Sequence, residues 1–356
     1  MGGMAMLVAL LIGDSVATAV APPHYTQDLA FKPVYAANAS AVTGVSACAV
    51  GTGSDPHVYV GQRGKGAPPI LVMDKTGKVL RGFGEGLVGN MHGMHMQSVG
   101  GKQFLWITDT RGSKVSKFDP ASGKLLASLG SHGTGLHPEI QFGSVADVAF
   151  DASGAVYISD GDGGVDSRIM KLDSSLKLEW AVGNNGTVTP AATPFASPHS
   201  LDYDPTTHRV FVADRNHNRI RAFDAATGAE VPGAWTAVFA SAHCENPAVW
   251  SVRVDASAGK IFVANSNFGS GSNCPAVPAT AHSGRVAIIP LPKTKGNLVE
   301  PPIASVGFAS LQHGFPHEIC VDARDGAIFA AAVDAADLPP ATGIGALTKY
   351  TVAKSD

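Results

Sequence analysis

The sequence predicts an all-β fold that closes into a six-bladed β-propeller, and three observations lead to this expectation. The 356 residues include 41 glycines and 23 prolines, together about 18% of the chain against roughly 12% in an average protein. So many turn-forming residues indicate short strands joined by tight turns rather than long helices. A strand-like unit recurs six times, and further strands flank most of its copies. A hydrophobic content of 45% and a net charge of −3 exclude a disordered chain.

The recurring unit is short and rich in β-branched and aromatic residues, which is typical of a strand. Its six copies are residues 58–61, 105–109, 156–160, 210–214, 261–265 and 328–331. Several copies follow a turn that contains aspartate and glycine, such as 151–154. The copies begin about 50 residues apart, and only the spacing before the last copy is longer. Each copy is therefore one part of a larger repeat of about 50 residues.

Each copy is expected to be the second strand of a four-stranded blade. A first strand is predicted about ten residues upstream, at 146–151, 199–204, 250–255 and 317–322. A third strand is predicted downstream, at 115–119, 168–173, 219–224 and 285–289, and a fourth often ends in glycine, as at 124–130 and 177–183. So many strands cannot remain one open sheet. The ring must therefore close, as a propeller of the NHL-repeat type.

The N-terminus suggests export. The apolar run Met4–Ile12 is too short to cross a bilayer of about 30 Å, but it suits the core of a signal peptide followed by small residues. We therefore expect residues 1–21 to be a signal peptide, 22–43 a lead-in segment and 44–356 the propeller, in a secreted or periplasmic protein. No later stretch reads as a membrane span, and the modest charge predicts no nucleic-acid partner.

The four cysteines form no Cys-x-x-Cys pair, so a zinc knuckle or a dithiol redox motif is not expected. A disulfide between Cys244 and Cys274 would hold the long loop between two strands, with two free thiols as the alternative. Cys48 and Cys320 lie in apolar strands and are expected to be core residues.

Three histidines occupy equivalent positions in alternate blades. When the first strands are aligned by their terminal aspartate, His199 and His317 match Ala146 and Trp250, and His92 takes the corresponding place in the second blade. Alternate blades of a six-fold ring lie about 120° apart, so the three side chains should meet at the axis. Three neutral imidazoles with one open position are the ligands of a catalytic zinc.

A single histidine at such a position is more simply a hydrogen-bonded residue of the channel, and only the trio favours a metal. The remaining histidines lack this phasing and are expected at the surface or in loops, including His95, His132, His217 and His313.

Six motifs resemble peptidyl-α-hydroxyglycine α-amidating lyase in their order and spacing. They are Gln62-Arg63-Gly64, Met91-His92-Gly93-Met94, Ser159-Asp160-Gly161, Pro198-His199-Ser200-Leu201, Val212-Ala213-Asp214-Arg215 and Pro316-His317-Glu318-Ile319. The similarity runs over residues 44–335. It implies a six-bladed propeller and a zinc-dependent lyase that cleaves the C–N bond of an α-hydroxyglycine adduct, releasing an amide and glyoxylate.

The resemblance also implies roles for single residues. His92, His199 and His317 look like the zinc ligands. Arg63 looks like the arginine that contacts the substrate, and Arg215 matches a second arginine of the pocket. The substrate would be a peptide or small molecule with a C-terminal α-hydroxyglycine-like group, whose carboxylate suits an arginine fork.

A structural calcium ion is implied as well. Glu318 stands where the family has an aspartate that binds it, and the backbone carbonyls near Val45 and at Met94 would complete the site. Carboxylate and carbonyl oxygens are the ligands that calcium prefers.

The chain departs from the family at the expected catalytic base. The family has a tyrosine just after the Asp-Gly of the third blade, whereas here Asp162 follows Gly161 and no tyrosine occurs nearby. Asp162 is the residue expected to take the proton instead, although a carboxylate is a weak base for an alcohol. Tyr157 and Tyr203 lie in predicted strands and should point elsewhere.

Two other function classes fit the same fold. One is a calcium-dependent lactonase or esterase, to which Asn265 and Asp214 could contribute. The other is a non-catalytic NHL propeller that binds a protein or peptide, which the missing tyrosine supports. Because three imidazoles are poor calcium ligands, the zinc lyase is favoured. The oligomeric state is not indicated by the sequence.

Overall fold

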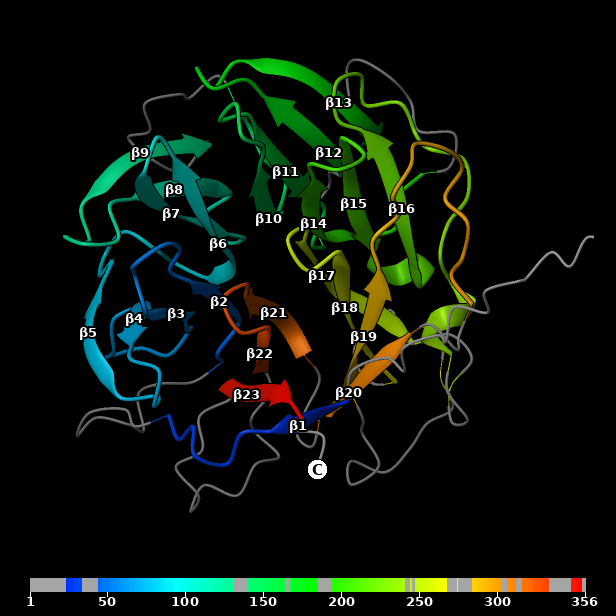
Figure 1. Cartoon of the computed structure of the whole chain (residues 1–356). Helices are drawn as coiled ribbons and strands as arrows, with labels where there is room; N and C mark the ends of the chain where they lie inside the picture. Colours follow the sequence, from blue (N-terminus) through cyan, green and yellow to red (C-terminus); the bar gives the residue numbers. More distant parts are fainter. Residues whose placement is uncertain are drawn as a thin grey trace, which may run out of the picture.

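Six β-sheets stand around a common axis in this computed structural model, as Figure 1 shows. The structure describes residues 24–33, 44–130, 140–163, 167–184, 194–240, 244, 247–267, 274, 284–302, 306–311, 316–332 and 347–353. The expected signal peptide, residues 1–21, lies outside this range. The predicted all-β, six-bladed propeller is confirmed. Neither of the short 3-10 helices in the described parts of the chain is long and apolar enough to cross a membrane.

The first three blades are regular four-stranded antiparallel sheets. Blade 1 consists of β2 (Ala47–Val50), β3 (Val58–Gly61), β4 (Ile70–Met73) and β5 (Val79–Phe83). Blade 2 consists of β6 (Met91–Val99), β7 (Lys102–Asp109), β8 (Lys114–Phe118) and β9 (Leu125–Gly130). Blade 3 consists of β10 (Val145–Phe150), β11 (Val156–Asp160), β12 (Ser167–Leu172) and β13 (Leu178–Asn184). At Gly183, next to the last residue of β13, φ is +125° and a Cβ would lie 2.3 Å from a backbone oxygen, so this position requires glycine.

The remaining blades include one exception to the four-strand pattern. Blade 4 has three strands, β14 (Pro198–Asp204), β15 (Arg209–Asp214) and β16 (Arg219–Asp224), and the isolated bridges Ile220–Trp235 and Phe223–Glu230 stand in place of a regular fourth. A 3-10 turn, η2 (Arg215–His217), joins β15 to β16. A second one, η3 (Ala237–Phe239), comes just after Trp235. Blade 5 consists of β17 (Ala248–Asp255), β18 (Lys260–Ser266), β19 (Gly284–Pro290) and β20 (Gly307–Leu311). Blade 6 consists of β21 (Pro316–Asp322), β22 (Ala327–Ala332), β23 (Leu347–Val352) and β1 (Tyr25–Gln27).

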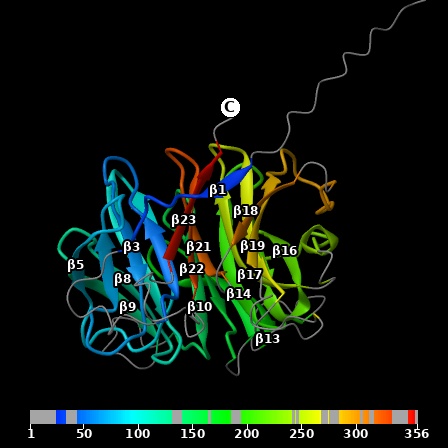
Figure 2. The same ribbon diagram turned by 90° about the horizontal axis from the view of Figure 1, so that it is seen from below.

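One strand of each blade lies next to the axis: β2, β6, β10, β14, β17 and β21. Each of these inner strands contacts the inner strands of both neighbouring blades, so the ring is continuous. In the view turned by 90°, the labelled inner strands β10, β14, β17 and β21 run roughly along the axis (Figure 2). Residues at equivalent positions of the inner strands therefore share one level of the ring.

The ring is closed by the N-terminal strand. β1 pairs antiparallel with β23, Tyr25 opposite Val352 and Gln27 opposite Tyr350, and becomes the outermost strand of blade 6. The expected boundary at residue 44 is therefore wrong, because the propeller already includes Tyr25–Gln27. A three-residue strand has no periodicity of its own, and its partner lies at the other end of the sequence.

Both cysteine pairs form disulfides, and no described cysteine is free. Cys48 of β2 is bonded to Cys320 of β21, so this bond joins the inner strands of blades 1 and 6. Both residues are buried, as expected, but they were not expected to pair. Cys244 and Cys274 are also bonded, which confirms the staple across the long loop of blade 5.

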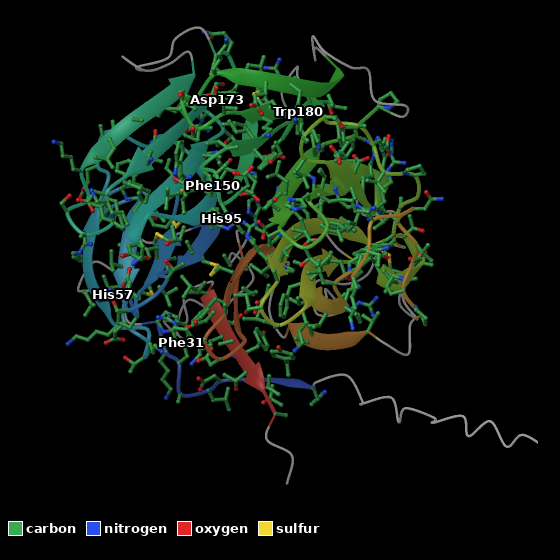
Figure 3. All side chains as sticks on the ribbon, turned by 45° about the horizontal axis from the view of Figure 1, so that its top comes forward. Phe31, His57, His95, Phe150, Asp173 and Trp180 are labelled. Atoms are coloured by element: carbon green, nitrogen blue, oxygen red, sulfur yellow. A yellow bond between two sulfur atoms is a disulfide. The ribbon has the colours of Figure 1, made fainter. Side chains whose placement is uncertain are left out.

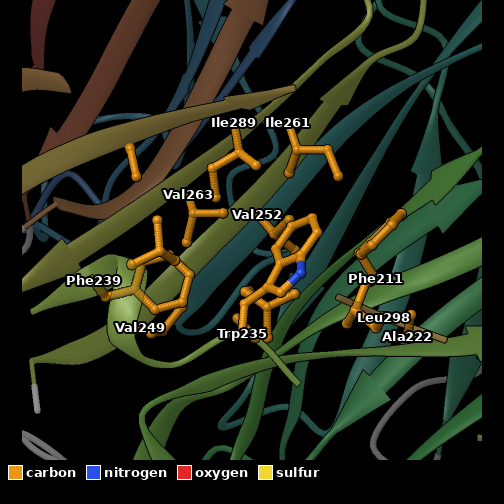
Figure 4. Close-up of a cluster of buried hydrophobic side chains, with 14 of the residues drawn as sticks. Phe211, Ala222, Trp235, Phe239, Val249, Val252, Ile261, Val263, Ile289 and Leu298 are labelled. Carbon is orange, nitrogen blue, oxygen red and sulfur yellow. The ribbon is translucent and has the colours of Figure 1, made fainter. Parts of the chain in front are cut away.

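The hydrophobic core is divided among the blade interfaces. The buried side chains of the described residues form six clusters, and each cluster lies between two neighbouring blades. Figure 4 shows the cluster between blades 4 and 5, where Trp235 stacks on Phe211 with ring centroids 5.6 Å apart. Because each blade buries both faces, its strands are hydrophobic on both sides instead of alternating.

Candidate metal centre

The three phased histidines meet at the axis. His92 extends from β6, His199 from β14 and His317 from β21, and one ring nitrogen from each lies within 4.8 Å of the others. Their ring centroids are 4.5 to 4.8 Å apart, and all three side chains are buried. The convergence predicted from blades 2, 4 and 6 is confirmed.

Each imidazole is oriented by the next blade of the ring. Nδ1 of His92 lies 2.8 Å from the carbonyl oxygen of Ala146 in blade 3. Nδ1 of His199 lies 2.7 Å from that of Trp250, and Nδ1 of His317 lies 2.7 Å from that of Ser46. Because a carbonyl oxygen only accepts, Nδ1 must carry the hydrogen, and the lone pair of each neutral ring is left on Nε2. This tautomer is the one that binds a metal through Nε2.

Aspartates at the ends of the second strands hold the starts of the inner strands. Asp109 accepts hydrogen bonds from the backbone N–H groups of Gly89 (2.6 Å) and Asn90 (2.9 Å), just before Met91 and His92. Asp214 likewise accepts from Ala196 N at 2.8 Å, just before β14 and His199. The recurring aspartate of the repeat therefore positions the histidine of its own blade.

The Nε2 atoms point to a cation between them. Those of His92 and His199 are buried, and neither has a hydrogen-bond partner. Nε2 of His92 also lies 2.8 Å from Oδ2 of Asp162. In the tautomer described above both of these atoms are acceptors, so the contact becomes favourable when a proton or a metal ion is shared between them. The three imidazoles, with a carboxylate beside them, form a donor set that fits zinc.

Burial and nearby charges favour the neutral form of His199 and His317. Burial lowers the pKa of His199 well below the usual value, and the charge of Arg215 lowers it further. Burial has the same effect on the pKa of His317, with smaller contributions from the other two histidines and Arg63. A neutral imidazole is the form in which histidine binds metals.

Asp162 lies between the histidines and an arginine. Its Oδ1 accepts a hydrogen bond from Nη1 of Arg215 at 2.8 Å, and Arg215 also stacks over the ring of Trp250, 4.9 Å from its centroid. Burial by itself raises the pKa of Asp162, but the contact with His92 and the positive charge of Arg215 outweigh it and hold the pKa well below the usual range. The carboxylate is therefore ionised at neutral pH.

Arg63 lies on the other side of His92. Its Nε donates to the carbonyl oxygen of Met91 at 2.7 Å, next to that histidine in the chain. A pocket of about 500 Å³ adjoins it, lined by residues 62–69 together with Glu85 and Met91. Arg63, Asp162 and Arg215 thus lie around the histidines as the sequence predicts, in loops on the same face of the ring.

Several other residues lie away from this centre. Tyr157 donates to Asp151 at 3.0 Å, at the opposite end of β11 from Asp162, and its ring stacks on that of Tyr203. Asp214 accepts from Arg219 at 2.9 Å, and Asn265 accepts from Arg285 at 3.2 Å. The two side chains that could contribute to a calcium-dependent hydrolase, Asp214 and Asn265, therefore each accept a hydrogen bond from an arginine.

The remaining histidines differ from expectation at one position. His95 is partly buried in β6, where its Nδ1 lies 2.9 Å from the carbonyl oxygen of Val148 and its ring contacts Phe150 (Figure 3). The expected surface or loop position is wrong for this residue. His217 lies in η2, as expected, and His132 and His313 lie outside the described residues.

The implied calcium site has a different occupant. The carboxylate of Glu318 accepts a hydrogen bond from Nη2 of Arg253, and both side chains are buried. Val45 and Met94 are buried too, with their side chains in the clusters between blades 6 and 1 and between blades 1 and 2. A guanidinium already neutralises the carboxylate, so these residues do not fit a calcium ion.

Sequence reasoning missed two features of the centre. The first is the set of carbonyl groups of Ser46, Ala146 and Trp250, although Ala146 and Trp250 were aligned with the histidines and are their equivalents in the next blade. The second is Arg253 of β17, because nothing in the local sequence distinguishes it from other residues in a strand. Only the convergence of four blades reveals its partners.

Comparisons with known proteins agree with the repeat and the fold described above. The NHL repeat family model matches residues 195–223, which span β14, β15 and most of β16. NHL repeat-containing protein 3 of Mus musculus is 32% identical over 311 residues, 84% of this chain and 79% of that protein. A solved chain titled "Structure of U3-55K" aligns with a TM-score of 0.51 at 10% identity, covering 87% of this chain and 80% of that chain, and so supports the fold alone.

Further relatives carry the name of an activity. The probable peptidyl-alpha-hydroxyglycine alpha-amidating lyase of Caenorhabditis elegans is 31% identical over 156 residues, which cover 44% of this chain and 43% of that protein. Peptidylglycine alpha-amidating monooxygenase of Rattus norvegicus is 34% identical over 182 residues, 49% of this chain and 18% of that protein. The chain therefore belongs to the family of NHL-repeat β-propellers that includes NHL repeat-containing protein 3, and the amidating lyases are among its relatives.

Proposed function

We propose that this protein is a zinc-dependent lyase that cleaves α-hydroxyglycine adducts to an amide and glyoxylate. The observation that carries the proposal is the convergence of His92, His199 and His317, whose orientation leaves the Nε2 lone pairs at the axis. The similarity to proteins named as amidating lyases supports the choice of reaction.

The residues around the histidines supply the other needs of this reaction. Arg63 can bind the carboxylate of the substrate through a two-pronged hydrogen bond. The adjoining pocket of about 500 Å³ offers room for the rest of the substrate. Zinc bound by the imidazoles would supply Lewis-acid polarisation of the substrate hydroxyl.

Asp162 is the proposed base. It is ionised and lies 2.8 Å from His92, within reach of a hydroxyl group held at the histidines. Removal of the hydroxyl proton turns the C–O bond into the carbonyl of glyoxylate. The electron pair of the broken C–N bond passes to nitrogen, which takes a proton and leaves as the amide. Arg215 keeps the carboxylate in place through its hydrogen bond to Oδ1.

Glyoxylate release from α-hydroxyhippurate by the zinc-loaded protein tests this function. We expect amide and glyoxylate in equal amounts, and Asp162→Asn should lower kcat by about 10²- to 10⁴-fold while zinc remains bound. Arg63→Met should mainly raise KM, because it removes the partner of the substrate carboxylate. Substitution of His95, which lies outside the centre, is the matched control and should change neither constant. Zinc-loaded protein that binds the substrate and releases no glyoxylate would contradict the proposal.

A binding propeller is the second candidate. It is favoured by the name of a relative that matches most of the chain, which states a repeat and no activity. In that case His199→Ala would leave binding of a peptide partner intact. The two disulfides support the further proposal that the protein works in an oxidising, extracytoplasmic compartment.

A further inference from the structure

A second level of polar side chains lies one residue further along the inner strands from the histidines. Asp147 of β10, Ser200 of β14 and Glu318 of β21 follow Ala146, His199 and His317 directly in the sequence. The fourth member, Arg253, comes from β17. The exposed fractions of Asp147, Glu318 and Arg253 are 2%, 3% and 5%, so the charges are enclosed.

The guanidinium of Arg253 joins the two carboxylates. Its Nη1 donates to Oδ2 of Asp147 at 2.8 Å and to the carbonyl oxygen of Val252 at 2.8 Å, and its Nη2 donates to Oε1 of Glu318. The hydroxyl of Ser200 donates to the same Oδ2 of Asp147 at 2.8 Å. Side chains from four consecutive blades are thus held in one network.

This network lies at the axis of the ring. Asp147 belongs to blade 3 and Glu318 to blade 6, and these blades face each other in a six-fold ring. A single guanidinium that contacts both carboxylates must therefore lie between them, close to the axis. Blade 2 contributes Gly93 here, where a Cβ would come within 2.4 Å of the Ala146 oxygen and 2.9 Å of Asp147 Oδ1.

Two enclosed carboxylates require a cation, because a buried carboxylate without a partner is strongly destabilising. A guanidinium is protonated at every physiological pH and presents a fork of donors that matches two carboxylates. Among the described residues, Arg253 is the cation in contact with both Asp147 and Glu318.

We propose that Arg253 is the built-in cation of the propeller axis and stands in place of a divalent metal between Asp147 and Glu318. The second level of the ring is therefore independent of calcium. Because the guanidinium also fills the axis beside the histidines, a substrate reaches the three-histidine centre from the face that carries Arg63, Asp162 and Arg215.

The test compares the calcium dependence of three proteins by thermal unfolding and calorimetric titration. The wild type should have the same Tm in millimolar calcium as in chelator, and titration should detect no calcium bound at this level. Arg253→Met should lower Tm in chelator by roughly 5–10 °C, because it leaves two carboxylates unpaired. Calcium should restore most of that loss in this variant, and adding Glu318→Gln should abolish the rescue.

Arg221→Met is the matched control. Arg221 is fully buried and pairs with Glu230 at 2.6 Å in blade 4, away from the axis, so its loss should lower Tm equally in calcium and in chelator. If Arg253→Met fails to fold, Arg253→Lys keeps the charge and should fold without calcium. Calcium binding by the wild type that Glu318→Gln removes would overturn the proposal, as would a lysine variant that calcium stabilises strongly.

Discussion

Three backbone carbonyl groups decide how the histidines of this centre present their nitrogens. The carbonyls of Ser46, Ala146 and Trp250 each hold one Nδ1, so the imidazoles are oriented before any metal binds. Because the ligands are already ordered, less conformational entropy is lost when a metal binds. The centre is therefore a property of neighbouring blades and not of single loops.

Loss of one imidazole should remove most of the zinc. His199→Ala leaves two ligands, so the affinity should fall by more than the roughly 100-fold that loss of an outer-shell partner costs. The metal content of the purified protein, measured by elemental analysis, checks this. His95→Ala is the control, since His95 also bonds a backbone carbonyl but lies outside the centre. Equal zinc content in both variants would show that the histidines do not form the site.

At the scale of single elements, the short strand β1 contributes to the closure of the ring. Its three residues complete blade 6 and bury Tyr25 against the cluster between blades 5 and 6. Just beyond the strand, Asp28 forms an ion pair of 3.0 Å with Lys349 of β23. This pair fastens the N-terminal strand to the C-terminal one where the ring closes.

The Asp28 pair predicts a pH-dependent stability. Burial is the largest single effect and raises the pKa of Asp28. The hydrogen bond and charge of Lys349, together with backbone hydrogen bonds from Ala30 and Phe31, outweigh it, so the pKa is lowered. A carboxylate with a lowered pKa stabilises the fold above its unfolded pKa of about 4, and this contribution is lost as the pH falls through the folded value. Asp28→Asn should therefore cost up to about 1 kcal/mol at pH 7 and almost nothing in strong acid. Urea unfolding at both pH values checks this, and Lys349→Met should lose the same amount at pH 7.

At the scale of the whole molecule, the ring depends on contacts between its two ends. The Cys48–Cys320 disulfide joins residues separated by 272 positions and links the first and last blades directly. The Cys244–Cys274 disulfide spans only 30 positions and holds a loop. Cross-linking distant residues restricts the unfolded chain more, so the first bond should matter more for the fold.

Replacement of each disulfide by two alanines tests this difference. Removal of Cys48–Cys320 should lower the free energy of unfolding by about 5 kcal/mol, and removal of Cys244–Cys274 by about 3–4 kcal/mol. Denaturant unfolding under identical buffer conditions gives both values. A smaller loss for the bond that closes the ring would show that β1 alone keeps the ends together.

Local patterns in the sequence determined the repeat and the phase of the three histidines. The strands of one blade are close in sequence, and the aligned inner strands place His92, His199 and His317 in alternate blades. The recurring aspartates were visible as well, since they end the second strands at Asp109, Asp160 and Asp214. These features depend on spacing within a repeat of about 50 residues.

Only the tertiary structure decided how the repeats cooperate. It placed β1 in the last blade, Asp162 against His92 and Arg215, and Arg253 between Asp147 and Glu318. Each of these contacts joins residues far apart in the chain, and no local periodicity marks them. Closure of the ring creates them, because it brings side chains from separate blades to one axis, where buried charges must find partners.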